Sequence, residues 1–213
     1  MSPERTDIII VSVNPSLMVR CGLAVSQTCP NHNIIPIDGR DGYTVGVNKG
    51  LKRSTAPYVL LLNDDAEIRS HDFTWHMQQT FRQVPHCACV GVVNPCRKPE
   101  MERNKGIVQV TPELSLDGFG IGDMKISFFC AMLSRQAIDA IGLLDEQFNP
   151  GYGEDDDWIA EAHLEGWGLG IHTDMLVNHE GGATSRTLHG IADIRKRNEA
   201  LLREKYAFYF PSA

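Results

Sequence analysis

Short apolar runs alternate along the first half of the chain with longer stretches of mixed polarity. The apolar runs lie at 7–13, 33–37, 58–62 and 89–93. Short continuous apolar runs bounded by turn residues are typical of buried strands. The stretches between them fit helices, which we predict as a short helix that opens at Pro15 and longer helices at 43–53 and 72–83. The alternation predicts an α/β fold in which a mixed, mainly parallel sheet is flanked by helices.

The second half continues this alternation after a less regular segment. Residues 99–123 are rich in Gly, Pro and charge, and we expect an irregular excursion there. A strand at 127–133, a helix at 135–141 and helical character at 158–166 follow. Residues 190–209 predict a charged helix, and we expect the aromatic side chains near its end to dock on the protein's own surface.

Composition and charge narrow the class of protein. The 213 residues carry 27 acidic and 20 basic side chains, a formal net charge of −7. This length favours one domain, and the charge argues against general nucleic-acid binding, which needs a basic surface. No apolar stretch approaches the roughly 20 residues of a membrane span, and the first residues do not resemble a signal peptide. We therefore expect a cytoplasmic protein.

The six cysteines do not form a convincing disulfide pattern, so we expect free thiols. His86, Cys87, Cys89 and Cys96 are close enough in sequence to be considered as zinc ligands. Their spacing is not that of a familiar zinc site, and partly buried thiols are the preferred interpretation.

The densest acidic cluster is Glu154, Asp155, Asp156 and Asp157, which directly follows a glycine-rich segment. Adjacent carboxylates repel one another unless a cation, a positively charged transition state or a helix N-terminus offsets their charge. Two interpretations remain open: a catalytic site, and an ordinary acidic first turn of the helix that continues through Trp158.

A second acidic cluster directly follows the predicted strand 58–62. Asn63, Asp64 and Asp65 come where open α/β sheets bind their ligands, beyond the carboxyl end of a strand. A histidine later in the chain, His179, can complete such a site. Two acidic clusters and one histidine suggest a metal-assisted reaction.

These segments follow one another as they do in a known class of enzymes. The strand that ends in Asp38, the helix segment 47–51 and the segment 60–65 resemble the nucleotide-sugar half of GT-A glycosyltransferases, especially family 2. The segments 129–135, 141–148 and 154–158 resemble the second half in order and spacing. The block 151–158 is also similar to the acidic motif of β-1,4-galactosyltransferases.

The resemblance covers about residues 7–187 and implies a single Rossmann-like GT-A domain. It places the nucleotide-sugar half at about 7–98, the acceptor half at about 124–187 and a helical tail at 190–213. It further implies a nucleoside-diphosphate-sugar donor and a glycan, lipid-linked, protein or modified nucleic-acid acceptor. The resemblance is also compatible with a homo-oligomer.

The resemblance also implies roles for individual residues of the donor half. Asp65 is expected to bind a divalent cation directly, with Asn63 and Asp64 near the ribose and diphosphate, because a departing diphosphate needs its charge neutralised. His179 is expected to add a metal ligand, and imidazole favours Mn²⁺ over Mg²⁺; a capping or surface histidine is the alternative. Asp38 is expected near the base and ribose, unless it is a simple turn residue. Asn48 is expected to contact the donor.

In the acceptor half, the resemblance implies that Asp155 is the general base of a single displacement with inversion. Glu154, Asp156 and Asp157 remain alternatives for the base, because coupled carboxylates cannot be told apart by sequence, and Asp156 is also expected to contact the acceptor. Tyr152 and Trp158 either form an apolar face for an acceptor sugar or belong to the core.

Three departures from the family pattern matter. No aromatic residue precedes Asn14, the span 14–33 is short for the usual helix, and the metal motif starts with Asn63, which predicts modest metal affinity. Two other classes therefore stay open: a catalytically silent binding module of the same fold, and a nucleotidyltransferase. The second lacks the glycine-rich basic loop that such enzymes carry after the first strand, since none occurs between Val13 and Arg20.

Overall fold

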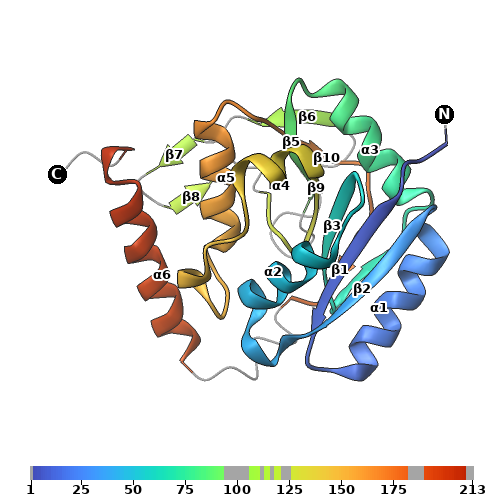
Figure 1. Cartoon of the computed structure of the whole chain (residues 1–213), viewed down its shortest axis with the longest axis horizontal. Coiled ribbons are helices and arrows are strands. Elements are labelled where there is room, and N and C mark those ends of the chain that lie inside the picture. The colour runs from blue at the N-terminus through green and yellow to red at the C-terminus, as the bar shows by residue number, and fades with distance from the viewer. Residues whose placement is uncertain are drawn as a thin grey trace.

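The structure is a computed structural model, and it describes residues 2–93, 106–110, 113–115, 118–120, 126–181 and 190–209. Strands and helices alternate along the chain (Figure 1). The strands are β1 (Thr6–Ser12), β2 (His32–Asp38), β3 (Tyr58–Asn63), β4 (Ala66–Ile68), β5 (Cys87–Val92), β6 (Ile107–Val110), β7 (Glu113–Ser115), β8 (Gly118–Gly120), β9 (Cys130–Ser134), β10 (Gly168–His172) and β11 (Val177–His179). The α-helices are α1 (Pro15–Thr28), α2 (Tyr43–Arg53), α3 (Phe73–Gln83), α4 (Arg135–Ile141), α5 (Glu154–Leu164) and α6 (Ile191–Lys205).

The main sheet of the described residues has seven strands in the order β2-β1-β3-β9-β5-β10-β6. β1 is parallel to β2 and β3, and β5 is parallel to β10. β9 runs antiparallel between β3 and β5, and β6 is antiparallel to β10. The outer strand β2 contains Pro36, which pairs in register with Ile10 of β1. Five of the seven strands therefore run in one direction, and β9 and β6 run against them, so the sheet is mixed and mainly parallel, as the alternating pattern predicts.

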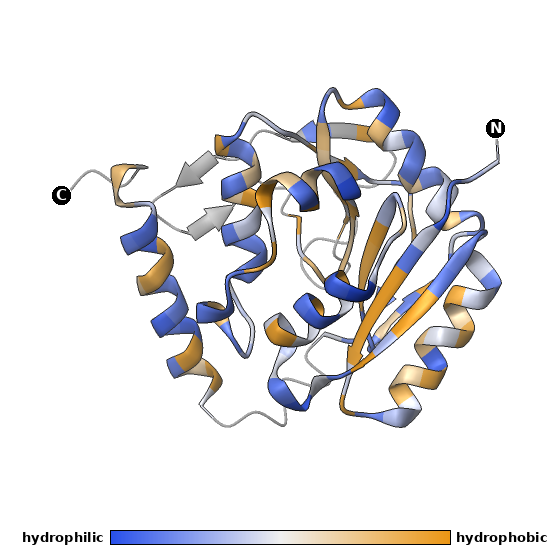
Figure 2. Cartoon of the chain, viewed as in Figure 1, coloured by the Kyte–Doolittle hydropathy of each residue, from blue (hydrophilic) through white to orange (hydrophobic). Residues whose placement is uncertain are grey.

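Two hydrophobic clusters cover the two faces of this sheet. One contains buried side chains of α2, α4 and α5, and the other contains those of α1, α3 and the small β4–β11 sheet. Figure 2 shows hydrophobic residues along β1 and β2, whereas the turns of α1 and α6 alternate between hydrophobic and hydrophilic residues. Burial on both faces explains why the central strands read as continuous apolar runs.

Helix α2 lies unusually close to β1 because two of its residues are glycines. A Cβ atom added at Gly46 would lie 2.6 Å from Cγ1 of Val11, and one added at Gly50 would lie 2.5 Å from Cγ2 of Ile9. Both distances are shorter than a carbon–carbon contact permits. The two glycines therefore fix the distance between α2 and the strand that leads to the candidate site.

Helix α6 packs on the outside of α5 rather than on the sheet (Figure 1). Leu202 and Tyr206 of α6 join a small buried cluster with Phe148 and with Ala160 of α5. This confirms the expected docking of the tail for Tyr206, whereas Phe208 is 70% exposed.

Most predicted elements are confirmed, two of them with the same bounds, α2 and α4. The short helix expected after Asn14 is wrong, because α1 runs for 14 residues; Asn14 caps it by accepting hydrogen bonds from the N–H groups of Ser16 and Leu17. The irregular excursion at 99–123 is wrong for 107–110, which form β6 in the main sheet, and for 113–115 and 118–120, which form the antiparallel pair β7–β8. Much of the remaining excursion lies outside the described residues.

The alternative of a zinc site at His86, Cys87, Cys89 and Cys96 is not supported. Cys87 and Cys89 belong to the two different hydrophobic clusters, and the His86 ring stacks on Trp167 with centroids 3.8 Å apart. Cys96 lies outside the described residues. The five described cysteines are buried free thiols.

Across the described parts of the chain, no helix combines the length and the apolar character that crossing a membrane requires.

Candidate active site at the carboxyl end of the sheet

Asp64 and Asp65 form the turn between β3 and β4, at the carboxyl end of β3. Both are buried, with 3% and 4% of their surface exposed. The Ser12 hydroxyl, at the end of β1, donates a hydrogen bond of 2.5 Å to Oδ2 of Asp64. Burial, followed by the charges of Asp64 and Asp65, raises the pKa of the Cys21 thiol to about 12. Two carboxylates are thus held at the place where ligands of α/β sheets bind.

His179 meets this turn through the pairing of two short strands. β11 runs antiparallel to β4, with His179 opposite Ala66, and the Glu180 N–H donates to the Asp65 carbonyl at 3.2 Å. This register places Nε2 of His179 3.1 Å from Oδ1 of Asp65. The Phe129 ring stacks on the imidazole at a centroid distance of 4.4 Å and shields that face.

Nε2 of His179 and Oδ1 of Asp65 are in direct contact at 3.1 Å. If a divalent cation binds here, the Asp65 carboxylate and the His179 imidazole are the side chains that would hold it. Within the described residues, no group of three or more His, Cys, Asp or Glu side chains could hold a metal ion. One carboxylate and one imidazole are donor types that Mn²⁺ accepts.

The four acidic residues of the second cluster form the first turn of α5. They follow the glycine loop, which we define as residues 148–153. Asp157 faces α6, where Nζ of Lys205 lies 2.7 Å from its Oδ1 and the Tyr206 hydroxyl donates to the same atom at 2.8 Å. At about 100° per residue, Asp155 points to the opposite side of α5, away from α6.

Tyr43, the first residue of α2, lies close enough to the start of α5 for the charges of Glu154 and Asp155 to act on its phenol. Its side chain is partly buried, and burial followed by the charges of Glu154 and Asp155 raises its pKa well above the usual range. Its hydroxyl donates a hydrogen bond of 2.7 Å to the Phe128 carbonyl.

The Phe128–Phe129 segment connects the two acidic clusters. It enters β9 at the carboxyl end of β3, where the Asn63 N–H donates to the Phe129 carbonyl at 2.8 Å. Phe129 contacts His179 on one face of the sheet, and the Phe128 carbonyl binds Tyr43 on the other. Both clusters therefore flank one short segment at the same end of the sheet.

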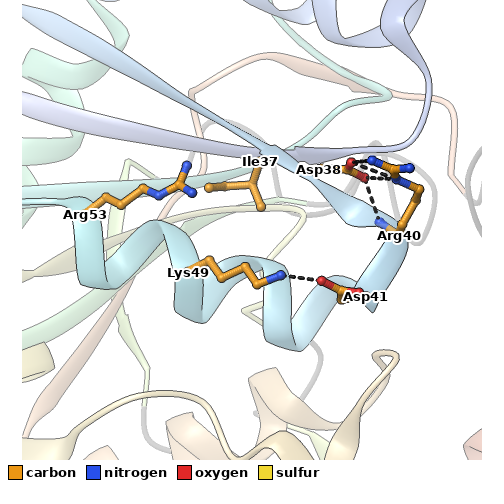
Figure 3. Close-up of a pocket in the computed structure, with 6 residues that line it drawn as sticks. All are labelled: Ile37, Asp38, Arg40, Asp41, Lys49 and Arg53. Atoms are coloured by element: carbon orange, nitrogen blue, oxygen red, sulfur yellow. Dashed lines mark hydrogen bonds and ion pairs between the residues drawn. The ribbon is translucent and has the colours of Figure 1, made fainter.

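A cavity of about 400 Å³ lies beside the end of β2 (Figure 3). Two ion pairs line it: Asp38 with Arg40, and Asp41 with Lys49. The side-chain hydrogen bond from Arg40 lowers the pKa of Asp38 to about 2, so this carboxylate is ionised at neutral pH. Arg53 and the apolar side chain of Ile37 complete the lining.

Two of the predicted site residues have structural roles instead. The amide of Asn48 donates to the Leu144 carbonyl at 2.8 Å and accepts from the Leu144 N–H at 2.9 Å, so it ties α2 to that segment rather than facing a donor. Trp158 is 1% exposed, and its Nε1 donates to the Gly142 carbonyl at 3.1 Å. The prediction of an acceptor-binding face at Trp158 is therefore wrong, and the core alternative holds.

Among the predicted acceptor-side residues, Glu154 is buried with 6% of its surface exposed, whereas Asp155 is partly exposed. Tyr152 and Asp156 are partly exposed, and the guanidinium of Arg195 lies 4.4 Å from the centre of the Tyr152 ring. Sequence reasoning missed Ser12, Tyr43 and Phe129. A polar residue at the end of the first strand is the one signal that could have pointed to Ser12.

Comparison with protein-family models gives no match, and comparison with curated protein sequences gives none either. Solved structures do match. A mannosyltransferase from Pyrobaculum calidifontis, in complex with GDP-Man and Mn²⁺, aligns with a TM-score of 0.64 and 13% identity over 100% of this chain and 66% of that one. GalNAc-T7 with UDP, GalNAc and Mn²⁺ aligns with a TM-score of 0.60 and 10% identity over 97% of this chain and 57% of that one.

A third similar structure, S. aureus TarS 1–349, aligns with a TM-score of 0.54 and 12% identity over 80% of this chain and 58% of that one. The chain thus spans between 57% and 66% of the length of these three structures. At such low identity the likeness concerns the fold. Strand order, the two covered faces and these neighbours together give the chain the fold of GT-A glycosyltransferases.

Proposed function

We propose that the protein is a metal-dependent glycosyltransferase that moves a sugar from a nucleoside-diphosphate donor to an acceptor hydroxyl. The observation that carries this proposal is the buried Asp65–His179 pair, with 3.1 Å between Oδ1 and Nε2, at the carboxyl end of β3 in a GT-A fold. Carboxylate and imidazole together suit Mn²⁺. Two of the similar structures contain Mn²⁺ with a nucleotide or nucleotide sugar, which supports the same choice.

The donor residues follow from their positions around this pair. Asp65 and His179 would hold the cation, which when bound would neutralise negative charge on the diphosphate as it leaves. Asp64, fixed by Ser12, and Asn63 would contact the ribose and diphosphate. Asp38 would contact the base or ribose at the end of β2, beside the charged cavity of Figure 3.

Asp155 would act as the general base. Two positions before Asp157, it lies on the side of α5 that points away from α6, so its carboxylate is available to an acceptor at this end of the sheet. It would take the proton of the acceptor hydroxyl as that oxygen attacks the anomeric carbon, giving inversion in one displacement. Glu154 is the second choice for this role, and Tyr152 and Asp156 would contact the acceptor.

The proposal is tested first by binding. Purified protein is mixed with UDP, GDP, TDP and CMP, and with the corresponding sugar nucleotides, each with and without Mn²⁺, and its unfolding temperature is measured. A ligand that binds only the native state raises apparent stability by RT ln(1 + [L]/Kd). A shift that requires both one nucleotide and Mn²⁺ is expected. Absence of any shift would favour the silent binding module.

Turnover then separates the chemistry from binding. With the donor identified, Asp155→Asn is expected to abolish sugar transfer and leave the donor-dependent shift intact, whereas Asp65→Ala should weaken donor and Mn²⁺ binding together. The released product identifies the reaction class, because sugar transfer releases a nucleoside diphosphate and nucleotidyl transfer releases pyrophosphate. Near-normal turnover of Asp155→Asn would refute the assignment of the base.

A further inference from the structure

The glycine loop, residues 148–153, has a backbone conformation that needs support from outside. Gly151, Tyr152 and Gly153 have consecutive positive φ angles of 144°, 71° and 98°. The left-handed region is costly for a residue with a side chain such as Tyr152. This loop leads directly into Glu154 and Asp155, so its conformation sets where those carboxylates lie.

Helix α6 supplies that support through one buried amide. Asn198 is 1% exposed, and its Nδ2 donates to the carbonyls of Phe148, Gly151 and Tyr152 at 3.0, 2.9 and 2.6 Å. Since an amide carries two N–H bonds, at least one of them is shared between two acceptors. The Asn198 Oδ1 accepts a hydrogen bond of 2.9 Å from Nε of Arg197, which fixes the orientation of the amide.

The remaining carbonyls of the loop are also bound. Arg197 Nη2 donates to the Asn149 carbonyl at 2.6 Å, the Tyr43 N–H donates to Pro150 at 2.9 Å, and the Asp157 N–H donates to Gly153 at 2.9 Å. Buried carbonyls without a partner are rare, because each costs free energy. Here α6 supplies the partners on one side of the loop and the start of α2 supplies one on the other.

Helix α6 also contacts α5 directly, through Lys205 and Tyr206. Lys205 pairs with Asp157 at 2.7 Å and with Glu161 at 2.8 Å, and the Tyr206 hydroxyl donates to the Asp157 carbonyl at 3.1 Å. The guanidinium of Arg195 lies over the Tyr152 ring. The contacts with Asp157 and Glu161 lie on the side of α5 that points away from Asp155, so they constrain its position without occupying its carboxylate.

We propose that α6 positions the glycine loop and the start of α5 for proton abstraction by Asp155, with Asn198 as the positioning residue. This inference rests on the proposed function. Asn198 touches neither donor nor acceptor; it acts through the backbone of residues 148–152. Loss of its N–H groups would leave three loop carbonyls with fewer partners and free the positive-φ segment to relax.

The test compares two isosteric amide-to-acid substitutions. Asn198→Asp removes the donors to the glycine loop. The control, Gln78→Glu, removes donors from an equally buried amide, which binds the Glu4 carbonyl at 2.8 Å and the Thr6 hydroxyl at 3.0 Å in another part of the fold. Both variants lose buried hydrogen bonds, so a general loss of stability affects both.

Three quantities are measured in each variant: amide hydrogen exchange, donor affinity in the presence of Mn²⁺, and the kcat and KM of nucleoside-diphosphate release. For Asn198→Asp we expect faster exchange at 151–157, unchanged donor affinity and a kcat about tenfold to a hundredfold lower, because misplacement of about 1 Å has that effect. Gln78→Glu should keep the kcat. A kcat for Asn198→Asp within about twofold of wild type, or an equal loss in both variants, overturns the inference.

A milder variant covers the case in which Asn198→Asp does not fold. Arg197→Met removes two hydrogen bonds of an exposed side chain, to the Asn149 carbonyl and to Oδ1 of Asn198, but keeps the N–H groups of Asn198; a smaller change in the same direction is expected. If wild-type protein neither binds nor turns over any donor, the proposed function fails. Amide hydrogen exchange of residues 151–157 then still tests whether Asn198 holds the glycine loop. Unchanged exchange in Asn198→Asp would show that it does not.

Discussion

The close contact between α2 and β1 predicts that a side chain added at Gly50 lowers the free energy of unfolding. Replacing Gly50 by alanine in a helix should gain about 1 kcal/mol of helix propensity. The added Cβ would, however, lie 2.5, 2.8 and 2.9 Å from Cγ2, Cδ1 and Cγ1 of Ile9. Three atoms of one side chain would have to move together, and Ile9 is 1% exposed in a central strand.

Overpacking of a filled core costs about 1–3 kcal/mol, and this contact belongs at the upper end because no rotamer change of a β-branched side chain relieves all three approaches. The overpacking cost therefore exceeds the propensity gain. We expect Gly50→Ala to lower the free energy of unfolding by about 2 kcal/mol, measured from the shift of the urea midpoint.

Gly22 provides the matched control, because it lies inside α1 and its added Cβ would lie no closer than 3.7 Å to Cδ1 of Ile34. Gly22→Ala should raise stability by up to about 1 kcal/mol. In an Ile9→Ala background the obstruction at Gly50 is gone, so Gly50→Ala should become stabilising there. Equal or higher stability of Gly50→Ala in the wild-type background would refute the reasoning.

Two further predictions concern an acid-sensitive carboxylate and a core tryptophan. Burial raises the pKa of Asp7, but hydrogen bonds from Ser54, Asn33 and the N–H groups of Thr55 and Ala56 outweigh it, so the net pKa is lowered. The ionised Asp7 side chain stabilises the fold fully above the unfolded pKa of about 3.9, and this stabilisation is lost as the pH falls through the lowered folded pKa. In Asp7→Asn, the free energy of unfolding should therefore depend less on pH in this acid range. An unchanged pH dependence of unfolding would contradict the prediction. Trp158→Phe should cost about 2 kcal/mol in urea unfolding, through the lost hydrogen bond to Gly142 and the lost volume, yet leave the KM for the acceptor unchanged. A raised KM would return Trp158 to the acceptor site.

The strands and the helices that flank them could be predicted because each carries its own local signal. The segment 43–53 has buried apolar residues at Val47 and Leu51 and follows Gly42, whose φ of 98° suits the start of a helix after a turn. The short pairing of β4 with β11 has no such signal. The approach of His179 to Asp65 depends on that pairing, so the sequence and the family resemblance could suggest the two residues but not their contact.

The roles of Trp158 and Asn198 could not be predicted from the sequence for a different reason. Trp158, Ile159 and Ala160 are consecutive apolar residues in α5, and no single face of a helix contains all three. The pattern makes sense because α5 is buried on two sides, against the sheet cluster and against α6. One asparagine in a charged helix carries no sequence signal of its own, because the role of Asn198 depends on a loop about 50 residues earlier in the chain.

The outer strand β2 has a consequence for how the molecule meets its own copies. A strand at the edge of a sheet exposes N–H and C=O groups that can recruit a strand from another molecule. β2 pairs with β1 without a change of register on both sides of Pro36. The N–H group that Pro36 lacks is therefore not one that would bond to β1, but one that would point to the free edge of β2. The free edge is thereby interrupted near its middle. Growth of the sheet from one molecule into the next is disfavoured there, and any homo-oligomer is expected to form through a different surface.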